Sequence, residues 1–471
     1  MTCCLCIGFL IFLLSMLILI LTVFYRVTRY QRYFNYSCNQ DFKISFGHQK
    51  TEQIALSCSK EGLCIDQLPD GFICAFLQIK VKATFFGKFF DPGFEIRSGD
   101  FLDRQYLARG ANGIRLINLT RLLKIHFKPG EPIPFRGIHL NWKPDSLILH
   151  VSRERISEQD RVVVIAPHPD DAEIAAFGVY ADTQATVVTI TAGEASDRYN
   201  GEMGVKLSAN QVARIRVWDS IKIPHFRGVV QEKAINLCYP DGKLRDLHFD
   251  QSRDFGQDNQ CINFQQLRKL SCSHLIGNEM SHSWKSLLND LVSVFSQLSP
   301  SVVVIPHPTL DPHPDHLFSS VAVVQALKLA QVKEVRLFLY CVHFKHTELY
   351  PFGPAGSGVS LPPILEGDEM GHVGFYSHSL SKERETEKYL ALEEMHDLRD
   401  MRGPYPESIR KQFRNLCRGI TSLILGLGSP PTSFLRRAVR PEEVFFVASL
   451  EEVERLIEVR LNQHPDKAHQ N

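Results

Sequence analysis

The chain has 471 residues, enough for two or three domains, and its composition is that of an ordinary globular protein. Its 53 basic and 52 acidic side chains nearly cancel. This balance indicates neither a basic field for nucleic acid nor an acidic, disordered tail. The only CxxC spacing among the twelve cysteines, Cys3 to Cys6, lies in a hydrophobic segment, which argues against a zinc ribbon.

The first segment of the chain is apolar. Cys3 to Tyr25 would span about 34 Å as a helix, enough to cross a bilayer. It has no basic n-region and no small-residue cleavage site, so we predict an uncleaved, single-pass transmembrane anchor with a basic flank over residues 1–32. By the positive-inside rule, the flank places the catalytic part of the chain on the cytoplasmic side of a membrane. Its arginines are Arg26, Arg29 and Arg32.

Residues 33–156 are predicted to form a β-rich, sandwich-like accessory domain. The run Leu77 to Lys82 alternates apolar and polar residues, and turn residues such as those in Asp91 to Gly93 separate the runs. We interpret the aromatic residues of this region as core, with contact to glycan or lipid as the alternative. An even set of cysteines allows two disulfides, although free buried thiols are the preferred interpretation. The set is Cys38, Cys58, Cys64 and Cys74.

From residue 157 to the C-terminus, strands and helices alternate, which predicts a Rossmann-like, doubly wound, mostly parallel sheet. The clearest expected strands are 162–165, 185–191, 302–305 and 335–342. We expect residues 231–280 to be mostly irregular. The Pro- and Gly-rich stretch 351–374 is interpreted as a surface loop that acts as a lid.

Two of these strands end in residues with metal-binding chemistry. The first runs into Pro167-His168-Pro169-Asp170-Asp171, and the second into Pro306-His307-Pro308 and then His313-Pro314-Asp315-His316. Because chemistry in open α/β sheets collects beyond the carboxyl ends of the strands, we expect the two stretches to meet. Either motif alone also fits a turn whose Asp caps the next helix, but the two together favour a metal site.

The residue types predict hydrolysis. His168, Asp171 and one His of the second stretch would supply three ligands for Zn²⁺ and leave a position open for water, and Fe²⁺ or Co²⁺ would also accept them. Asp170 is placed to take a proton from that water. A second His would donate to a developing oxyanion or to a leaving nitrogen. On the next helix, Arg214 and Arg216 are candidates to hold an anionic substrate group, with solvated helix charges as the alternative.

At these positions the chain resembles the PIG-L, or LmbE-like, family of zinc-dependent deacetylases. The resemblance covers roughly residue 161 to the C-terminus. Its specific motifs are Pro167 to Ile174 and His313 to His316. Weaker similarities are Thr191 to Glu194, Tyr239 to Gly242, 388–398 and 442–445.

The resemblance implies a role for each site residue. The metal ligands would be His168, Asp171 and His316, with Asp170 as general base and His313 as the group that stabilises the oxyanion or protonates the amine. Two further carboxylates would orient the ligands from behind. These are Glu173 and Asp315.

The resulting hypothesis is a membrane-anchored hydrolase that removes the N-acetyl group from an N-acetylglucosamine-type amino sugar in a glycoconjugate or glycolipid. Two alternatives stay open. One is a zinc amidase that acts on a larger amide conjugate, and the other is a catalytically inactive, glycan-binding membrane protein.

Overall fold

The computed structural model describes residues 12–18, 30, 32–40, 42–43, 46–47, 51–59, 62–195, 207–254, 262–277, 281–371, 373–398 and 437–463. The predicted N-terminal transmembrane helix is wrong as an element of this fold. No helix in these ranges is long and apolar enough to cross a membrane. The helix over residues 12–18 rises only about 10 Å, a third of a bilayer core. Residues 1–11 and 19–29 lie outside the described ranges. The predicted location of the chain at a membrane stays a prediction.

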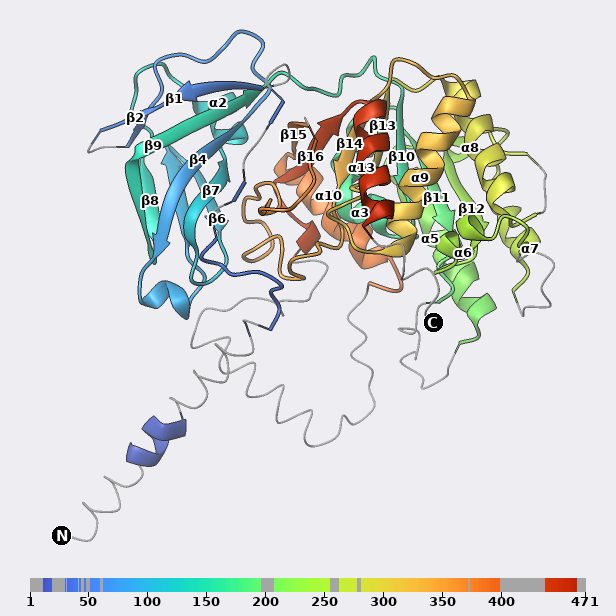
Figure 1. Cartoon of the computed structure of the whole chain (residues 1–471), viewed down its shortest axis with the longest axis horizontal. Coiled ribbons are helices and arrows are strands. Elements are labelled where there is room, and N and C mark those ends of the chain that lie inside the picture. Colours follow the sequence, from blue (N-terminus) through green and yellow to red (C-terminus); the bar gives the residue numbers. More distant parts are fainter. Residues whose placement is uncertain are drawn as a thin grey trace.

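The N-terminal part of the chain forms antiparallel sheets around one apolar core (Figure 1). One sheet has the order β1 (Thr51–Ala55), β9 (Leu140–Ser152), β4 (Cys74–Ala83) and β7 (Asn112–Asn118). The other has the order β6 (Phe101–Tyr106), β5 (Gly93–Ser98) and β8 (Phe135–Ile138). Smaller elements are the hairpin of β2 (Ser57–Cys58) and β3 (Leu63–Cys64), the short helix η1 (Phe86–Lys88) and α2 (Thr120–His126). The four cysteines of this region are free thiols, as the preferred interpretation expected.

A large, mostly parallel sheet organises the rest of the chain. Its order is β12 (Ala234–Tyr239), β11 (Thr186–Thr191), β10 (Val162–Ala166), β13 (Val302–Pro306), β14 (Arg336–Tyr340), β16 (Glu442–Ala448) and β15 (Gly374–Ser379). The first five strands are parallel, and β16 runs antiparallel to both of its neighbours. β9 ends at Ser152 and β10 begins at Val162, so the predicted domain boundary at residue 156 lies between the two sheets.

Helices cover both faces of this sheet, which buries both faces of its central strands. One apolar cluster takes up alternate strand residues such as Val163 and Ile165, and the other takes up Val162 and Val164. The first cluster includes α6 (Leu244–Phe249), α8 (Trp284–Leu298), α9 (Pro314–Leu329) and α13 (Leu450–Asn462). The second includes α3 (Asp171–Ala175), α4 (Phe177–Asp182), α5 (Ala209–Phe226), α7 (Phe264–Arg268) and α10 (Lys382–Glu394).

Two sequence-based expectations for connecting segments are wrong. The stretch 231–280 contains the fully buried edge strand β12, which was missed because its six residues are too few to show a period. The stretch 351–374 is bound to the β-sandwich and is not a free lid. Its Gly358 N–H donates to the carbonyl of Arg104 (2.9 Å), and the buried Arg440 guanidinium donates to four of its carbonyls.

The sandwich packs on the edge of the large sheet that β15 forms (Figure 1). Phe375 of β15 contacts the rings of Phe46 and Phe76, with ring centroids 4.7 and 4.9 Å away. In the middle of the sheet, the chain leaves β10 in one direction to β11 and β12 and returns to β13 on the other side of β10. The carboxyl ends of β10 and β13 therefore flank the topological switch point, where α/β sheets bind their ligands.

Candidate functional site

Three predicted ligands converge at this switch point. His168 and Asp171 follow β10, where the carboxylate of Asp171 folds back to accept the backbone N–H of His168 (2.9 Å). His316 lies in the first turn of α9, which Pro314 begins and which His313 caps. Since β10 and β13 pair in parallel register, their two connections end side by side.

The three ligand atoms form a triangle with equal sides. His168 Nδ1, Asp171 Oδ2 and His316 Nε2 lie 3.2 Å from one another in all three pairs. All three residues are buried. Ligand atoms bound at 2.0–2.1 Å around a tetrahedral ion would lie about 3.4 Å apart, so the triangle fits one metal ion of the zinc type.

Charge within the triangle agrees with this fit. Burial alone would raise the pKa of Asp171, but the imidazoles of His316 and His168 hold it well below its usual value. Burial would lower the pKa of His316, but Asp171 and Asp311 raise it to about 10. The protein thus stabilises the ionised form of Asp171 and favours positive charge next to it.

Carboxylates behind the triangle orient its imidazoles, the arrangement typical of metal-bound histidine. Asp311 Oδ2 accepts from His316 Nδ1 (2.9 Å) and from the backbone N–H groups of Val342 and His343 (3.2 and 3.1 Å). His168 Nε2 faces Asp241 Oδ1 at 3.2 Å and Asp315 Oδ2 at 3.4 Å.

Of the two predicted supports, Asp315 lies at the site and Glu173 does not contact a ligand through its described hydrogen bonds. Asp315 also accepts the N–H groups of Gly242 (2.7 Å) and Leu244 (3.2 Å), which ties α9 to the turn after β12. Glu173 accepts from the hydroxyl of Tyr180 (3.2 Å), and burial raises its pKa to about 8. Glu173 lies in α3 and links this helix to Tyr180 of α4.

The predicted base, Asp170, lies beside the triangle and is held by Arg216. Asp170 Oδ1 is 3.2 Å from Arg216 Nη2, which also binds Asp397 Oδ2 at 2.7 Å. Burial and the charge of Asp397 raise the pKa of Asp170 to about 7, although Arg216 opposes the shift. In this structure Arg216 is therefore part of the site, but it is engaged by two carboxylates. Arg214 lies on the exposed face of α5 and does not join them.

One glycine makes the contact of Arg216 possible. Gly193 follows β11 with φ of +71°, and its carbonyl accepts from Arg216 Nη1 (3.0 Å). A Cβ at this position would lie 2.8 Å from that nitrogen and 2.9 Å from Pro169. The next residue, Glu194, accepts the backbone N–H of Asp241 (2.9 Å) and so fixes the turn that faces His168.

His313 lies at the open side of the triangle. Its ring packs edge-on to His168 with centroids 4.7 Å apart, and it is half-buried. Burial and the neighbouring charges of His168 and His316 lower its pKa to about 4. Since Nδ1 accepts the backbone N–H of Asp315 (3.2 Å), neutral His313 carries its proton on Nε2 and can donate it. His343 stacks on its ring at 5.7 Å.

Sequence reasoning missed four polar residues of this region. Asp241 stood in a segment noted only as a weak similarity, and Asp311 was passed over within the second motif. Asp397 stood in the segment 388–398, which was also noted only as a weak similarity. His343 carries no local signal, because the chain brings it in from after β14. The other strand-end histidine, His307, is fully buried away from the triangle, and its Nδ1 accepts the N–H groups of Thr309 and Leu310 (both 3.3 Å).

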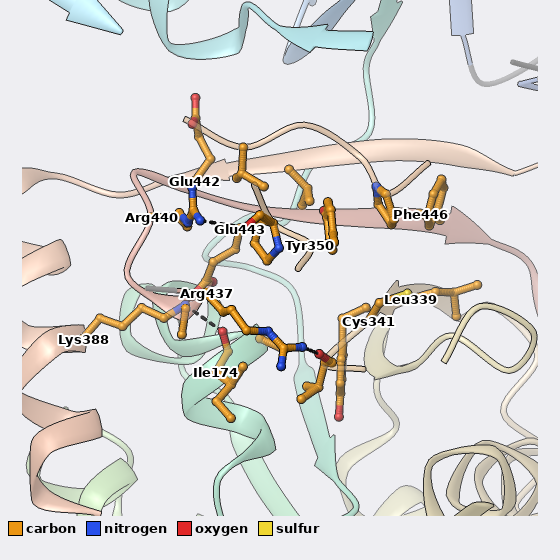
Figure 2. A pocket seen from close by; sticks show the side chains of 18 residues that line it. Ile174, Leu339, Cys341, Tyr350, Lys388, Arg437, Arg440, Glu442, Glu443 and Phe446 are labelled. Atoms are coloured by element: carbon orange, nitrogen blue, oxygen red, sulfur yellow. Dashed lines mark hydrogen bonds and ion pairs between the residues drawn. The ribbon is translucent and has the colours of Figure 1, made fainter. Parts of the chain in front are cut away.

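Behind α3 lies a small cavity of ≈ 60 Å³ with a buried ion pair in its wall. Figure 2 shows Lys388 reaching Ile174 and Glu443. Lys388 Nζ donates to the carbonyl of Ile174 (3.0 Å) and to Glu443 Oε1 (2.7 Å). Glu443 also accepts the N–H groups of Gly178 and Val179 (3.0 and 3.3 Å). The pair therefore caps the end of α3 and the start of α4.

Fold and site together describe an α/β protein with two imidazoles and one carboxylate placed to hold a single metal ion at the switch point of its sheet. The family model described as GlcNAc-PI de-N-acetylase, PIG-L, matches residues 163–327, and this stretch is a PIG-L domain. The predicted family resemblance is confirmed there, and with it the prediction of a deacetylase-class enzyme domain at the level of the family. No curated protein matches the chain.

Several solved structures match over a longer stretch. One is the N,N'-diacetylchitobiose deacetylase from Pyrococcus horikoshii, with 16% identity over 63% of this chain and 88% of that chain, and a TM-score of 0.32. Another is the A40926 pseudoaglycone deacetylase Dbv21, with 17% identity over 62% and 98%, and a TM-score of 0.34. A third is GalB, the 4-carboxy-2-hydroxymuconate hydratase from Pseudomonas putida KT2440, with 15% identity over 61% and 96%, and a TM-score of 0.29. At this level of similarity none of them assigns a substrate.

Proposed function

We propose that the chain hydrolyses the N-acetyl group of an N-acetylglucosamine-type amino sugar in a glycoconjugate or glycolipid, and so releases acetate and a free amine. The observation that carries the proposal is the equal 3.2 Å triangle of His168, Asp171 and His316. Asp170 precedes Asp171 in the chain, and the ring of His313 lies against those of His168 and His316. When bound there, Zn²⁺, or Fe²⁺ or Co²⁺ in its place, would lower the pKa of a water molecule and polarise the acetyl carbonyl.

The protein's own groups would move the protons. Asp170, oriented by Arg216, takes a proton from the attacking water. His313 directs its Nε2–H at the carbonyl oxygen as negative charge develops there, which is the role of an oxyanion-hole donor. The C–N bond then breaks, and the leaving nitrogen takes the proton that Asp170 accepted from the water. Water and amide are thereby converted to acetate and amine with no further reactant.

The test is product analysis with the purified, zinc-loaded chain on a panel of N-acetylglucosamine conjugates. We expect equal amounts of acetate and free amine from the wild type. Asp170→Asn keeps the shape of the side chain but cannot accept the proton, so kcat should fall at least about 100-fold. The exposed Asp250→Asn is the matched control and should leave kcat unchanged.

Three outcomes would overturn the proposal. Unchanged turnover by Asp170→Asn would remove the base from the mechanism. Release of an acid other than acetate would identify an amidase on a larger conjugate, and glycan binding without any turnover at saturating zinc would identify an inactive binding protein. A mass-spectrometric search of membrane glycolipids for a change of one acetyl group, with and without the protein, would then narrow the substrate.

A further inference from the structure

The end of the β-sandwich at η1 presents two neighbouring phenylalanine side chains to solvent. Phe85 is 69% exposed and Phe86 is 58% exposed, among the highest values of the large apolar residues in the described ranges. Their rings lie 5.8 Å apart at 77°, and the half-buried Phe89 lies 5.2 Å from the ring of Phe85. Figure 1 shows the short η1 helix at the lower end of the sandwich, below β4.

The backbone holds this aromatic tip (residues 85–90) firmly in place. Gly87 is buried, and its carbonyl accepts the N–H of Gly110 (2.9 Å), while Thr84 N–H donates to the carbonyl of His139 (3.0 Å). A Cβ at Gly87 would lie only 2.3 Å from that same carbonyl oxygen. The two rings are thus displayed by a fixed turn anchored to two other loops, and they stay more than half exposed.

Four exposed lysines lie in the tip or on the strands β4 and β9 that lead to it. The exposed lysines are Lys80, Lys82, Lys88 and Lys143. Lys80 stands directly opposite Lys143 across the β4–β9 pair, a placement that costs stability because like charges repel there. None of the four forms an ion pair with another residue in the described part of the chain, and the neighbours of Lys82 across the sheet are Asn112 and Asn141. An unrelieved repulsion of this kind is best explained by an anionic partner.

We propose that this end of the sandwich docks on the surface of a lipid bilayer that contains anionic lipids, with Phe85 and Phe86 inserted between headgroups and the four lysines above them. Phenylalanine without a polar tip suits the acyl boundary, and basic side chains suit the charged headgroups. A sugar platform is the poorer fit, because the two rings are nearly perpendicular and offer no flat face. The docking surface lies outside the metal site and does not depend on its chemistry.

Vesicle binding by the full chain tests this proposal. We would titrate phosphatidylcholine vesicles with and without 30% phosphatidylserine, at low and high salt, and compare apparent affinities. Wild type should prefer anionic vesicles and weaken with salt. Phe85→Ser with Phe86→Ser should bind at least about tenfold more weakly. Lys82→Gln with Lys88→Gln should lose roughly fivefold per lysine, because each contributes about 1 kcal/mol at an anionic surface.

The controls match each change elsewhere on the surface. Phe249→Ser removes an equally exposed phenylalanine (58%) from α6, and Lys128→Gln removes a sandwich lysine that pairs with Glu131. Both should bind vesicles within twofold of wild type, and all variants should keep wild-type turnover of a water-soluble substrate. Equal vesicle binding by wild type and the double phenylalanine variant would overturn the proposal. So would binding of a soluble anionic polysaccharide that depends on the two phenylalanines, in the absence of any vesicle binding.

Discussion

Two buried ionic clusters flank helix α3, and they differ in whether the protein satisfies them itself. Lys388 and Glu443 pair with each other and spend their remaining hydrogen bonds on the carbonyl of Ile174 and the N–H groups of Gly178 and Val179. The triangle of His168, Asp171 and His316 directs its ligand atoms at one another with no other cation between them. The first cluster is complete as it stands, whereas the second requires a partner. In this protein, the buried ionic cluster that indicates a functional site is the one whose ligand atoms are arranged around a common point.

The largest expected effect is at the open cluster. His168→Ala removes one of three ligands, so we expect zinc content to fall from one per chain to near zero and turnover to fall by about 10⁴-fold. Elemental analysis and an acetate-release assay measure both. The exposed His274→Ala is the control and should keep its zinc. Equal zinc in the two variants would remove His168 from the ligand set.

The closed cluster should respond in stability. Lys388→Met leaves Glu443 buried without its cation, and we expect a loss of about 3–5 kcal/mol in the free energy of unfolding, measured with urea. Replacing both partners, as Lys388→Met with Glu443→Leu, should cost less than the single change. Zinc affinity of the folded single variant should stay within a few-fold of wild type. If Lys388→Met lost zinc but kept its free energy of unfolding, the Lys388–Glu443 pair would belong to the metal site and not to the structural framework.

Removing the charge of a carboxylate that orients a ligand should reduce zinc affinity less than removing the ligand itself. Asp311→Asn weakens the acceptor that orients His316 Nδ1, so zinc affinity should fall about 10- to 100-fold while the stoichiometry stays at one. Competition with a chelator measures this. Asp368→Asn is the matched control, because Asp368 also binds an imidazole, that of His346 (2.9 Å), but away from the site. If zinc affinity fell equally in both variants, Asp311 would have no specific role in orienting a metal ligand.

The smallest effect is a pH dependence outside both clusters. Burial, followed by the charge of Asp103, raises the pKa of Glu442 well above its usual value. The folded chain therefore keeps a proton that the unfolded chain releases above about pH 4.3, and stability is lost as pH rises beyond that value. Glu442→Gln should gain about 1 kcal/mol at pH 8 in urea unfolding, and less at pH 5. Exposed Glu451→Gln should change little at either pH.

The sequence predicted best where a strand and its motif are contiguous. The valine-rich run before Pro167 forms β10, and the run before Pro306 forms β13, each within a residue of its expected end. Helix capping is equally local, since Ser283 begins α8 with a reciprocal pair of hydrogen bonds to Ser286, three residues further on. Such features depend on β-branching, side-chain caps and proline, which act over a few residues and are visible in the sequence.

Where the sequence left alternatives, packing decided. Arg214 and Arg216 are two residues apart on α5, so they point to different sides of the helix. Arg216 reaches Asp170 because its side of α5 is packed against the rest of the domain, whereas Arg214 is exposed. β12 was missed because short apolar strands carry no period. The transmembrane prediction took an apolar composition as sufficient for a membrane-spanning helix. No helix of that length and apolarity is present in the described ranges.

The sequence by itself determined which residues stand at the ends of β10 and β13, and that two histidines and one carboxylate are available there. Only the tertiary structure decided that Asp241, Asp311, Asp397 and His343 join them. Local steric and hydrogen-bonding preferences set the first group. The second depends on strand order, because the switch point between β10 and β13 gathers loops that are up to 229 residues apart, from His168 to Asp397. No local pattern encodes which strand ends become neighbours.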